Sequence, residues 1–170
     1  MGSVLDPDLV ALAAGVAQRL LASGRQLVTA ESCTGGWIAK VCTDLPGSSG
    51  WFRGGAVAYS NELKMALLGV RPETLASEGA VSEAVVREMV LGALEQLGGD
   101  VAVAVSGIAG PQGGAPGKPV GTVWLAWAVR DTSGPRVHSV EALFGGDRER
   151  VRRLTVHRAL AGLLDVTRPS

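Results

Sequence analysis

The sequence predicts a single α/β domain, a three-layer α/β/α sandwich around a mixed sheet. Its 170 residues fit one domain whose core can form without disulfides. Hydrophobic residues make up 46% of the chain, which is typical of globular α/β proteins and not of disordered ones. Segments with helical periodicity alternate with short apolar segments that are typical of strands.

Helix and strand signals alternate through the first half of the chain. Asp6 and Pro7 form a typical helix start, and apolar residues then recur at helical spacing until Gly24. Ser60 or Asn61 suits the cap position of a short helix. The expected elements are a helix that ends at Gly24, a strand over 26–30, a helix over 35–44, a strand over 52–59, a helix over 61–68 and a short turn or helix from residue 71.

The second half begins with a longer helix, which Ser82 caps and Gly98 ends. Residues 101–105 are all apolar, as in a strand buried on both faces. Two further strands are expected to form a hairpin through the polar segment between them. The expected elements here are strands over 101–105, 122–129 and 137–144, and a last helix that runs from residue 148 to about residue 164.

Composition and charge exclude several classes of function. The formal net charge is zero, and no basic tract marks a nucleic-acid binder. No apolar run approaches the ~18 residues that span a membrane. The start of the chain carries Asp6 and Asp8 and no basic leader, which argues against a signal peptide. Cys33 and Cys42 lack the spacing of a metal site, so we expect reduced thiols in a cytoplasmic protein without a metal.

The segment over 29–36, TAESCTGG, is the most informative in the chain. It lies between a strand-like and a helix-like run, so it places hydroxyl groups, the Glu31 carboxylate and two glycines on a strand-to-helix turn. Free backbone N–H groups and the positive end of a helix dipole suit such a turn to an anion, and it can also hold a nucleophile. The alternative is a plain helix cap in which Ser32 or Thr34 bonds the helix N–H groups.

Three further segments carry polar groups beside glycines. Ser48 and Ser49 lie on a glycine-flanked loop that leaves their hydroxyls free, or that is a simple solubilising turn. The long loop from Ser106 and Gly107 follows the most apolar strand, where open α/β sheets bind ligands, although the loop could also be idle. Arg148 opens the last helix and can fork onto a phosphate or a carboxylate, unless it faces water.

Tyr59 and Lys64 lie at a strand end and in the helix that follows it. A phenol and an amine held close together can relay a proton, but a lysine base needs a large downward shift from a pKa of about 10.4. The Tyr-x4-Lys spacing and the missing dinucleotide fingerprint argue against a short-chain dehydrogenase. The alternative is an aromatic strand end beside a solvated lysine. His138 and His157 stand alone, so lysine is the better base for a serine nucleophile.

Six runs of sequence, in this order along the chain, resemble the C-terminal domain family of the competence/damage-inducible protein CinA. The resemblance extends over nearly the whole chain, so one domain over residues 1–170 is expected. The runs are AESCTGG (30–36), GSS (47–49), YSN (59–61) with Lys64, GAVS (79–82), SGIAGP (106–111) and KPVGTV (118–123).

The resemblance implies an amidohydrolase of pyridine nucleotide recycling, like the stand-alone nicotinamide-nucleotide amidohydrolases of that family. The implied reaction hydrolyses the carboxamide of nicotinamide mononucleotide to nicotinate mononucleotide and ammonia, without a cofactor. Glycine-flanked helix starts agree with a nucleotide phosphate, and hydroxyls with an amide substrate. The alternative is a nucleotide-binding or scaffold module without turnover, because a fold can persist without its chemistry.

On this resemblance we expect a serine nucleophile, with Ser49 favoured over Ser32, and Lys64 as the base. Tyr59 would relay the proton or orient the amide. A pyridine mononucleotide and a second copy of the chain are the expected partners, and nucleic acid and membranes are not. The residues expected to bind the substrate are Glu31, Thr34, Gly35, Gly36, Ser48, Asn61, Ser106, Gly107 and Arg148.

Overall fold

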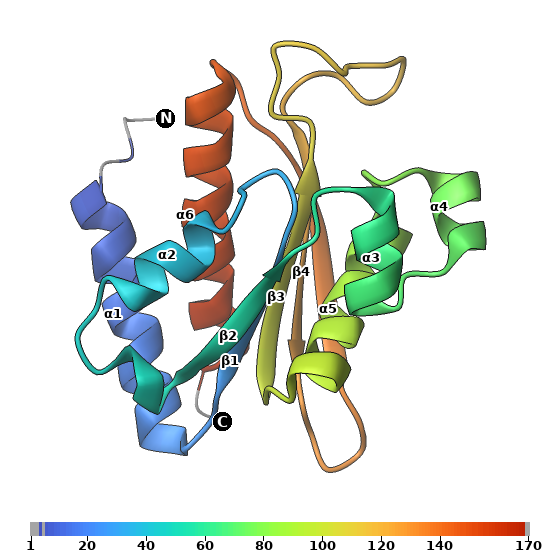
Figure 1. The fold of residues 1–170 in the computed structure, drawn as a ribbon. Helices are drawn as coiled ribbons and strands as arrows, with labels where there is room; N and C mark the ends of the chain where they lie inside the picture. Colours follow the sequence, from blue (N-terminus) through green and yellow to red (C-terminus); the bar gives the residue numbers. More distant parts are fainter. Residues whose placement is uncertain (1–3, 5, 169–170) are drawn as a thin grey trace.

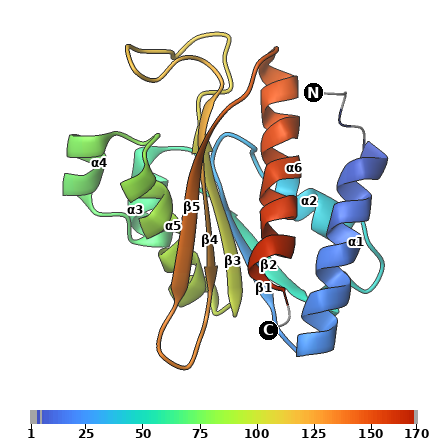
Figure 2. The ribbon, with the colours of Figure 1, turned by 180° about the vertical axis from the view of Figure 1, so that it is seen from behind.

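The computed structural model describes Val4 and residues 6–168, and these residues confirm the three-layer sandwich (Figure 1). The elements are α1 (Asp6–Ser23), β1 (Leu27–Glu31), α2 (Trp37–Thr43), the 3-10 turn η1 (Ser48–Gly50), β2 (Phe52–Val57), α3 (Asn61–Leu68), α4 (Pro72–Glu78), α5 (Glu83–Leu97), β3 (Val101–Gly107), β4 (Thr122–Val129), β5 (Arg136–Leu143) and α6 (Arg148–Val166). The helices α1, α2 and α6 cover one face of the sheet, and α5 covers the other with α3 and α4 beside it (Figures 1 and 2).

The sheet is mixed, as expected, and its five strands in the described residues lie in the order β2-β1-β3-β4-β5. β1 pairs in parallel with β2 and with β3, whereas β3–β4 and β4–β5 are antiparallel. The predicted hairpin of β4 and β5 is therefore confirmed. Because β1, β2 and β3 run in one direction, the segments that follow them meet at one end of the sheet, the upper end in Figure 1.

The central strands β1, β3 and β4 are buried on both faces, which explains why they are rich in apolar residues. Along β3, Val101, Val103 and Val105 pack in the core on the α1 and α6 side. Ala102 and Ala104 alternate with them and pack in the core beneath α5. A strand in this position needs apolar side chains at every residue, because successive side chains point to opposite faces.

Three element boundaries beside the candidate site differ from the prediction. β1 ends at Glu31, one residue later than expected, and α2 begins later because Gly35 and Gly36 adopt left-handed backbone, with φ of 62° and 93°, in the turn between them. β2 ends at Val57, earlier than expected, so Tyr59 belongs to the connection to α3. These changes lengthen the loops that follow both strands.

The close packing of α5 on α3 gives a test of the core. A Cβ added at Gly92 would overlap the carbonyl oxygen of Leu68, so we expect Gly92→Ala to lower the free energy of unfolding by about 2 kcal/mol. Gly15→Ala is the matched control, because a Cβ there meets only the flexible Leu164 side chain at 3.3 Å. The control should be neutral or gain up to about 1 kcal/mol from helix propensity. Urea unfolding measures both, and equal stabilities would contradict the prediction.

Candidate active site

The turn between β1 and α2 is organised by the buried carboxylate of Glu31. One oxygen accepts hydrogen bonds from the Thr34 hydroxyl at 2.6 Å, the Gly36 N–H at 3.1 Å and the Ile38 N–H at 3.0 Å. The other accepts from the Ala39 N–H at 2.8 Å. Glu31 therefore caps the first turn of α2 with its own negative charge, where the helix dipole favours one.

This arrangement corrects the anion site predicted for the turn. The backbone N–H of Gly36 and the Thr34 hydroxyl already bond to Glu31, and the Gly35 N–H bonds to the Ser32 carbonyl at 3.0 Å. Glu31 is 1% exposed, so it stabilises the turn from inside and does not reach a substrate from the surface. The start of α2 consequently offers no open cradle for a phosphate.

Ser32 and Lys64 form a buried contact at the carboxyl end of the sheet. The Lys64 Nζ lies 3.0 Å from the Ser32 Oγ, 3.0 Å from the Ala58 carbonyl oxygen and 3.3 Å from the Tyr59 carbonyl oxygen. The Ser32 N–H donates to the Val105 carbonyl at 3.1 Å, which ties the serine to β3. Ser32 is 8% exposed and Lys64 only 2%, so the pair sits just beneath the surface.

The Lys64 amine is a candidate base because of where it is buried. Burial lowers the pKa of Lys64 from its ordinary value of 10.5, and a negative charge on the nearby Cys33 would oppose this only in part. Burial also raises the pKa of the Cys33 thiol to about 12, so that group stays neutral at neutral pH and offers no partner charge. None of the ion pairs within the described residues includes Lys64. The amine can therefore lose its proton more readily than a surface lysine.

Tyr59 and Arg148 form a hydrogen bond on the surface beside the Ser32–Lys64 pair. The Arg148 guanidinium donates to the Tyr59 phenol oxygen at 3.0 Å and to the Gly110 carbonyl at 2.8 Å. Tyr59 is 60% exposed, and its contact with Lys64 runs through its backbone carbonyl. The predicted phenol–amine relay is thus not formed by a direct bond, and the phenol instead faces an arginine.

Arg152 is a residue that the sequence reasoning missed. Its guanidinium donates to the Cys33 carbonyl at 3.0 Å and to the Thr34 carbonyl at 2.9 Å, and it lies 5.4 Å from the centre of the Trp37 ring. Its position four residues after Arg148 on one helix was the available signal, because residues at that spacing share a helix face. Arg152 thereby holds the turn that carries the candidate serine.

The structure does not bring Ser48 and Ser49 to Lys64. Both serines lie in η1, directly before β2, at the amino end of the parallel strands. Ser32 follows β1 at the opposite end, and the five residues of β1 span roughly 16 Å at the usual strand rise. The predicted pairing of Ser49 with Lys64 is therefore corrected, and Ser32 is the serine that the lysine contacts.

The other predicted substrate residues lie at the carboxyl end of the sheet. Ser106 is buried, and its hydroxyl donates to the Ala80 carbonyl at 2.7 Å. Gly107 ends β3, and a Cβ there would press on Val123 of β4. Asn61 begins α3 and is exposed. No hydrogen bond joins Ser106, Gly107 or Asn61 to Ser32 or Lys64.

A pocket of about 290 Å³ adjoins the turn after β1. Its walls include the backbone of Gly35 and Gly36, the Trp37 ring and the cations Lys40 and Arg152. Thr34, which lies two residues after the candidate Ser32, is one of its lining residues.

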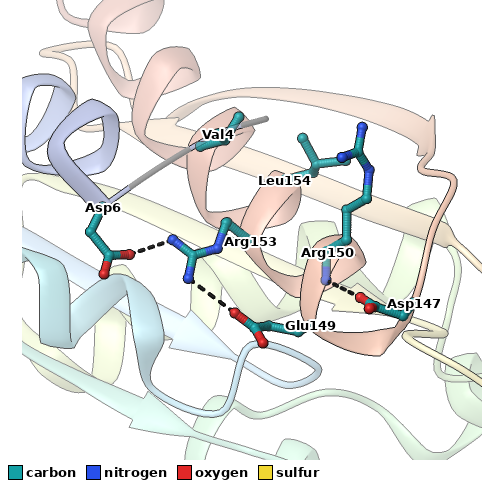
Figure 3. A pocket seen from close by; sticks show the side chains of 7 residues that line it. All are labelled: Val4, Asp6, Asp147, Glu149, Arg150, Arg153 and Leu154. Atoms are coloured by element: carbon teal, nitrogen blue, oxygen red, sulfur yellow. Dashed lines mark hydrogen bonds and ion pairs between the residues drawn. The ribbon is translucent and has the colours of Figure 1, made fainter. Parts of the chain in front are cut away.

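A second cavity, of about 460 Å³, lies where α6 begins against the start of α1 (Figure 3). Its charged side chains pair with one another: the Arg153 guanidinium bonds to Asp6 and, at 3.1 Å, to Glu149 (Figure 3). Neither Ser32 nor Lys64 lines it. This cavity is separate from the serine–lysine contact.

Two features are absent from the described part of the chain. No helix there is long and apolar enough to cross a membrane. No group of three or more histidine, cysteine, aspartate or glutamate residues there could hold a metal ion.

The Glu31 cap gives a test of how the turn is held. We expect Glu31→Gln to lower the free energy of unfolding by about 3 kcal/mol, because three charge-assisted bonds weaken and an amide NH₂ then faces N–H donors. Glu62→Gln, an exposed carboxylate in the first turn of α3, is the matched control and should change stability by less than about 0.5 kcal/mol. Urea unfolding and hydrogen exchange at the Ile38 and Ala39 amides measure the effect. Unchanged exchange at those amides would contradict the assigned cap.

Comparisons with known proteins agree with the resemblance seen in the sequence. The family model described as the CinA C-terminal domain matches residues 9–167. The chain is 53% identical over 158 residues to a protein named nicotinamide-nucleotide amidohydrolase PncC from Escherichia coli (strain K12), across 93% of this chain and 94% of that protein. A protein of the same name from Pseudomonas putida is 53% identical over 163 residues, across 95% and 98% of the two chains.

A solved structure shows the same fold. The crystal structure of the competence/damage inducible protein CihA from Agrobacterium tumefaciens matches with a TM-score of 0.91 and 41% identity, across 95% of this chain and 96% of that one. The match to the family model spans nearly all of the described residues. The chain therefore belongs to the CinA C-terminal domain family.

Proposed function

We propose that this chain is a nicotinamide-nucleotide amidohydrolase that converts nicotinamide mononucleotide and water to nicotinate mononucleotide and ammonia. Relatives that carry this enzyme name are 53% identical over more than nine-tenths of the chain, which supports the activity. The mechanism that we propose rests on one observation, the 3.0 Å contact between the Lys64 Nζ and the Ser32 Oγ.

The three neighbours of the Lys64 Nζ accommodate both the ammonium, which donates to all three, and the neutral amine. Two of them, the carbonyl oxygens of Ala58 and Tyr59, can only accept hydrogen bonds. The third, the Ser32 hydroxyl, can also donate. A neutral amine has two N–H donors for the carbonyls and one lone pair for the hydroxyl proton, so the set matches a base poised to deprotonate a serine.

In the first half of the proposed reaction, the Ser32 Oγ attacks the carboxamide carbon while the Lys64 Nζ takes the hydroxyl proton. A tetrahedral intermediate forms, and its C–N bond then breaks as the Lys64 ammonium returns the proton to the leaving nitrogen. Ammonia departs, and the nicotinoyl group stays on Ser32 as an ester. The two carbonyl bonds keep the amine aimed at the reacting atoms throughout.

In the second half, the Lys64 amine accepts a proton from a water molecule that attacks the ester carbon. The new tetrahedral intermediate collapses, the bond to the Ser32 Oγ breaks, and the proton passes from Lys64 to that oxygen. Nicotinate mononucleotide leaves with the water oxygen in its carboxylate. The enzyme returns to its starting state, with one amide bond and one water consumed.

Arg148 is the residue that we assign to the substrate phosphate. Arg148 is exposed, and its guanidinium donates a hydrogen bond to the Tyr59 phenol oxygen. The backbone carbonyl of Tyr59 in turn accepts a hydrogen bond from Lys64. A guanidinium offers a fork of donors that fits phosphate oxygens. The phenol is then placed to orient the nucleotide. The pocket beside Gly35 and Gly36 offers a further surface for the nucleotide to contact.

Two finer expectations remain part of this proposal. We place the enzyme in the cytoplasm, which the two free cysteines support. We also propose a homo-oligomer, because apolar side chains are exposed together along the edge strand β2 and helix α3. The exposed side chains of this strip are Val57, Tyr59, Leu63 and Leu67. Light scattering of the purified protein measures the state, and a monomer at all concentrations would refute it.

Substitution of the serine–lysine pair tests the mechanism. We expect Lys64→Met and Ser32→Ala each to lower kcat for ammonia release from nicotinamide mononucleotide by about 10³-fold or more, because base and nucleophile act as a unit. Ser49→Ala is the matched control and should keep kcat within about twofold, because it lies outside the reacting group. Circular dichroism checks the fold of each variant. A large loss in Ser49→Ala with an active Ser32→Ala would overturn the assignment, and wild-type binding without ammonia would favour a non-catalytic module.

The pH dependence of turnover gives an independent test. The base acts when neutral, and burial places the pKa of Lys64 below 10.5. We therefore expect kcat/KM to rise with pH through that lowered pKa and to fall as the amine becomes protonated at lower pH. Steady-state rates across a pH series measure the profile. A profile that falls with rising pH through the neutral range would contradict a lysine base.

A further inference from the structure

A basic pocket lies at the end of the molecule opposite the candidate active site. It has a volume of about 650 Å³, within the range usual for small-molecule sites. The ends of α1 and α6 and the start of β5 form its walls, at the lower end of Figure 1. Ser32 and Lys64, which follow β1 and β2, lie at the other end of the sheet. A ligand bound here does not touch the proposed catalytic groups.

Four arginines from separate parts of the chain converge on this pocket. Arg19 comes from α1, Arg25 from the connection to β1, Arg136 from β5 and Arg168 from the segment after α6. No carboxylate is among its lining residues. In a chain with a formal net charge of zero, this is a local concentration of positive charge.

The surrounding groups neutralise this charge only in part. Asp131 pairs with Arg136 at 3.2 Å, and Asp165 pairs with Arg168 at 2.7 Å. Arg19 donates to the Leu164 carbonyl, which carries no formal charge. Arg25 belongs to none of the ion pairs within the described residues. The four guanidinium groups and two carboxylates leave an excess of positive charge.

The number of donors favours a ligand with more than one phosphate. Each guanidinium can present a pair of N–H groups to two phosphate oxygens, and a phosphate monoester has only three free oxygens. A pyrophosphate carries more free oxygens over a longer span, so it can engage more of the four arginines at once than a single phosphate can. The pocket also has apolar wall, from Ala22 of α1 and Val166 of α6, against which the organic part of a ligand can pack.

We propose that this pocket binds a nucleotide through a pyrophosphate group, with the arginines on its phosphate oxygens and Ala22 and Val166 against its organic part. The site is distinct from the amidohydrolase site, so its occupant is a ligand and not the substrate. Electrostatic contacts of this kind weaken as salt rises. Binding should consequently fall with ionic strength.

Calorimetric titration of the whole chain with ADP, inorganic pyrophosphate and AMP tests the proposal. We expect ADP and pyrophosphate to bind at least about tenfold more tightly than AMP, because AMP has one phosphate and forms fewer charge-assisted hydrogen bonds with the arginines. Arg25→Gln and Arg136→Gln should each weaken ADP binding by about tenfold. Arg71→Gln, which removes an arginine paired with Glu88 on the other face of the sheet, is the matched control and should leave it unchanged.

The amidohydrolase reaction separates this site from the catalytic one. Arg25→Gln and Arg136→Gln should keep the wild-type kcat and KM for nicotinamide mononucleotide, which also shows that they fold. ADP should not compete with that substrate. Competitive inhibition by ADP, equal binding of ADP and AMP, no binding of ADP, or a loss in Arg71→Gln alone would each overturn the proposal.

Discussion

The buried carboxylate of Glu31 holds the turn on which the candidate site depends. Its oxygens accept the Thr34 hydroxyl and three backbone N–H groups at the start of α2. A buried carboxylate without such donors would cost several kcal/mol, so the charge and the turn stabilise each other. Ser32 follows directly, and its N–H bonds to Val105 of β3. The candidate nucleophile is thus fixed by the cap on one side and by the sheet on the other.

The cationic side chains of the site differ in burial according to whether they can lose a proton. Arginine keeps its proton in proteins, and Arg148 and Arg152 bond carbonyl and phenol oxygens around the loops. Lysine can lose its proton when it is buried, and Lys64 is 2% exposed. The buried position therefore holds the cation that can become a base, while the partly exposed positions hold cations that remain charged.

The sequence was sufficient for the sandwich, because apolar periodicity and the all-apolar run of β3 follow from burial on both faces. It also singled out Ser32, Tyr59 and Lys64. It did not show that Lys64 contacts Ser32 rather than Ser49, because motif spacing does not say at which end of a parallel sheet a loop lies. Chain order does contain this information: Ser32 follows its strand, whereas Ser49 precedes one. The roles of Glu31 and Arg152 depend on side-chain direction, which spacing alone does not determine.

Helix α6 joins three loops that come from distant parts of the chain. Arg148 bonds Tyr59 after β2 and Gly110 after β3, and Arg152 bonds the turn after β1. A ribosome makes α6 after every other element of the sandwich, and domains generally fold as units once they emerge. A nascent chain that already contains Ser32 and Lys64 lacks the helix that secures their loops. The order of synthesis therefore leaves the loops around Ser32 and Lys64 without these arginine contacts until α6 has been made.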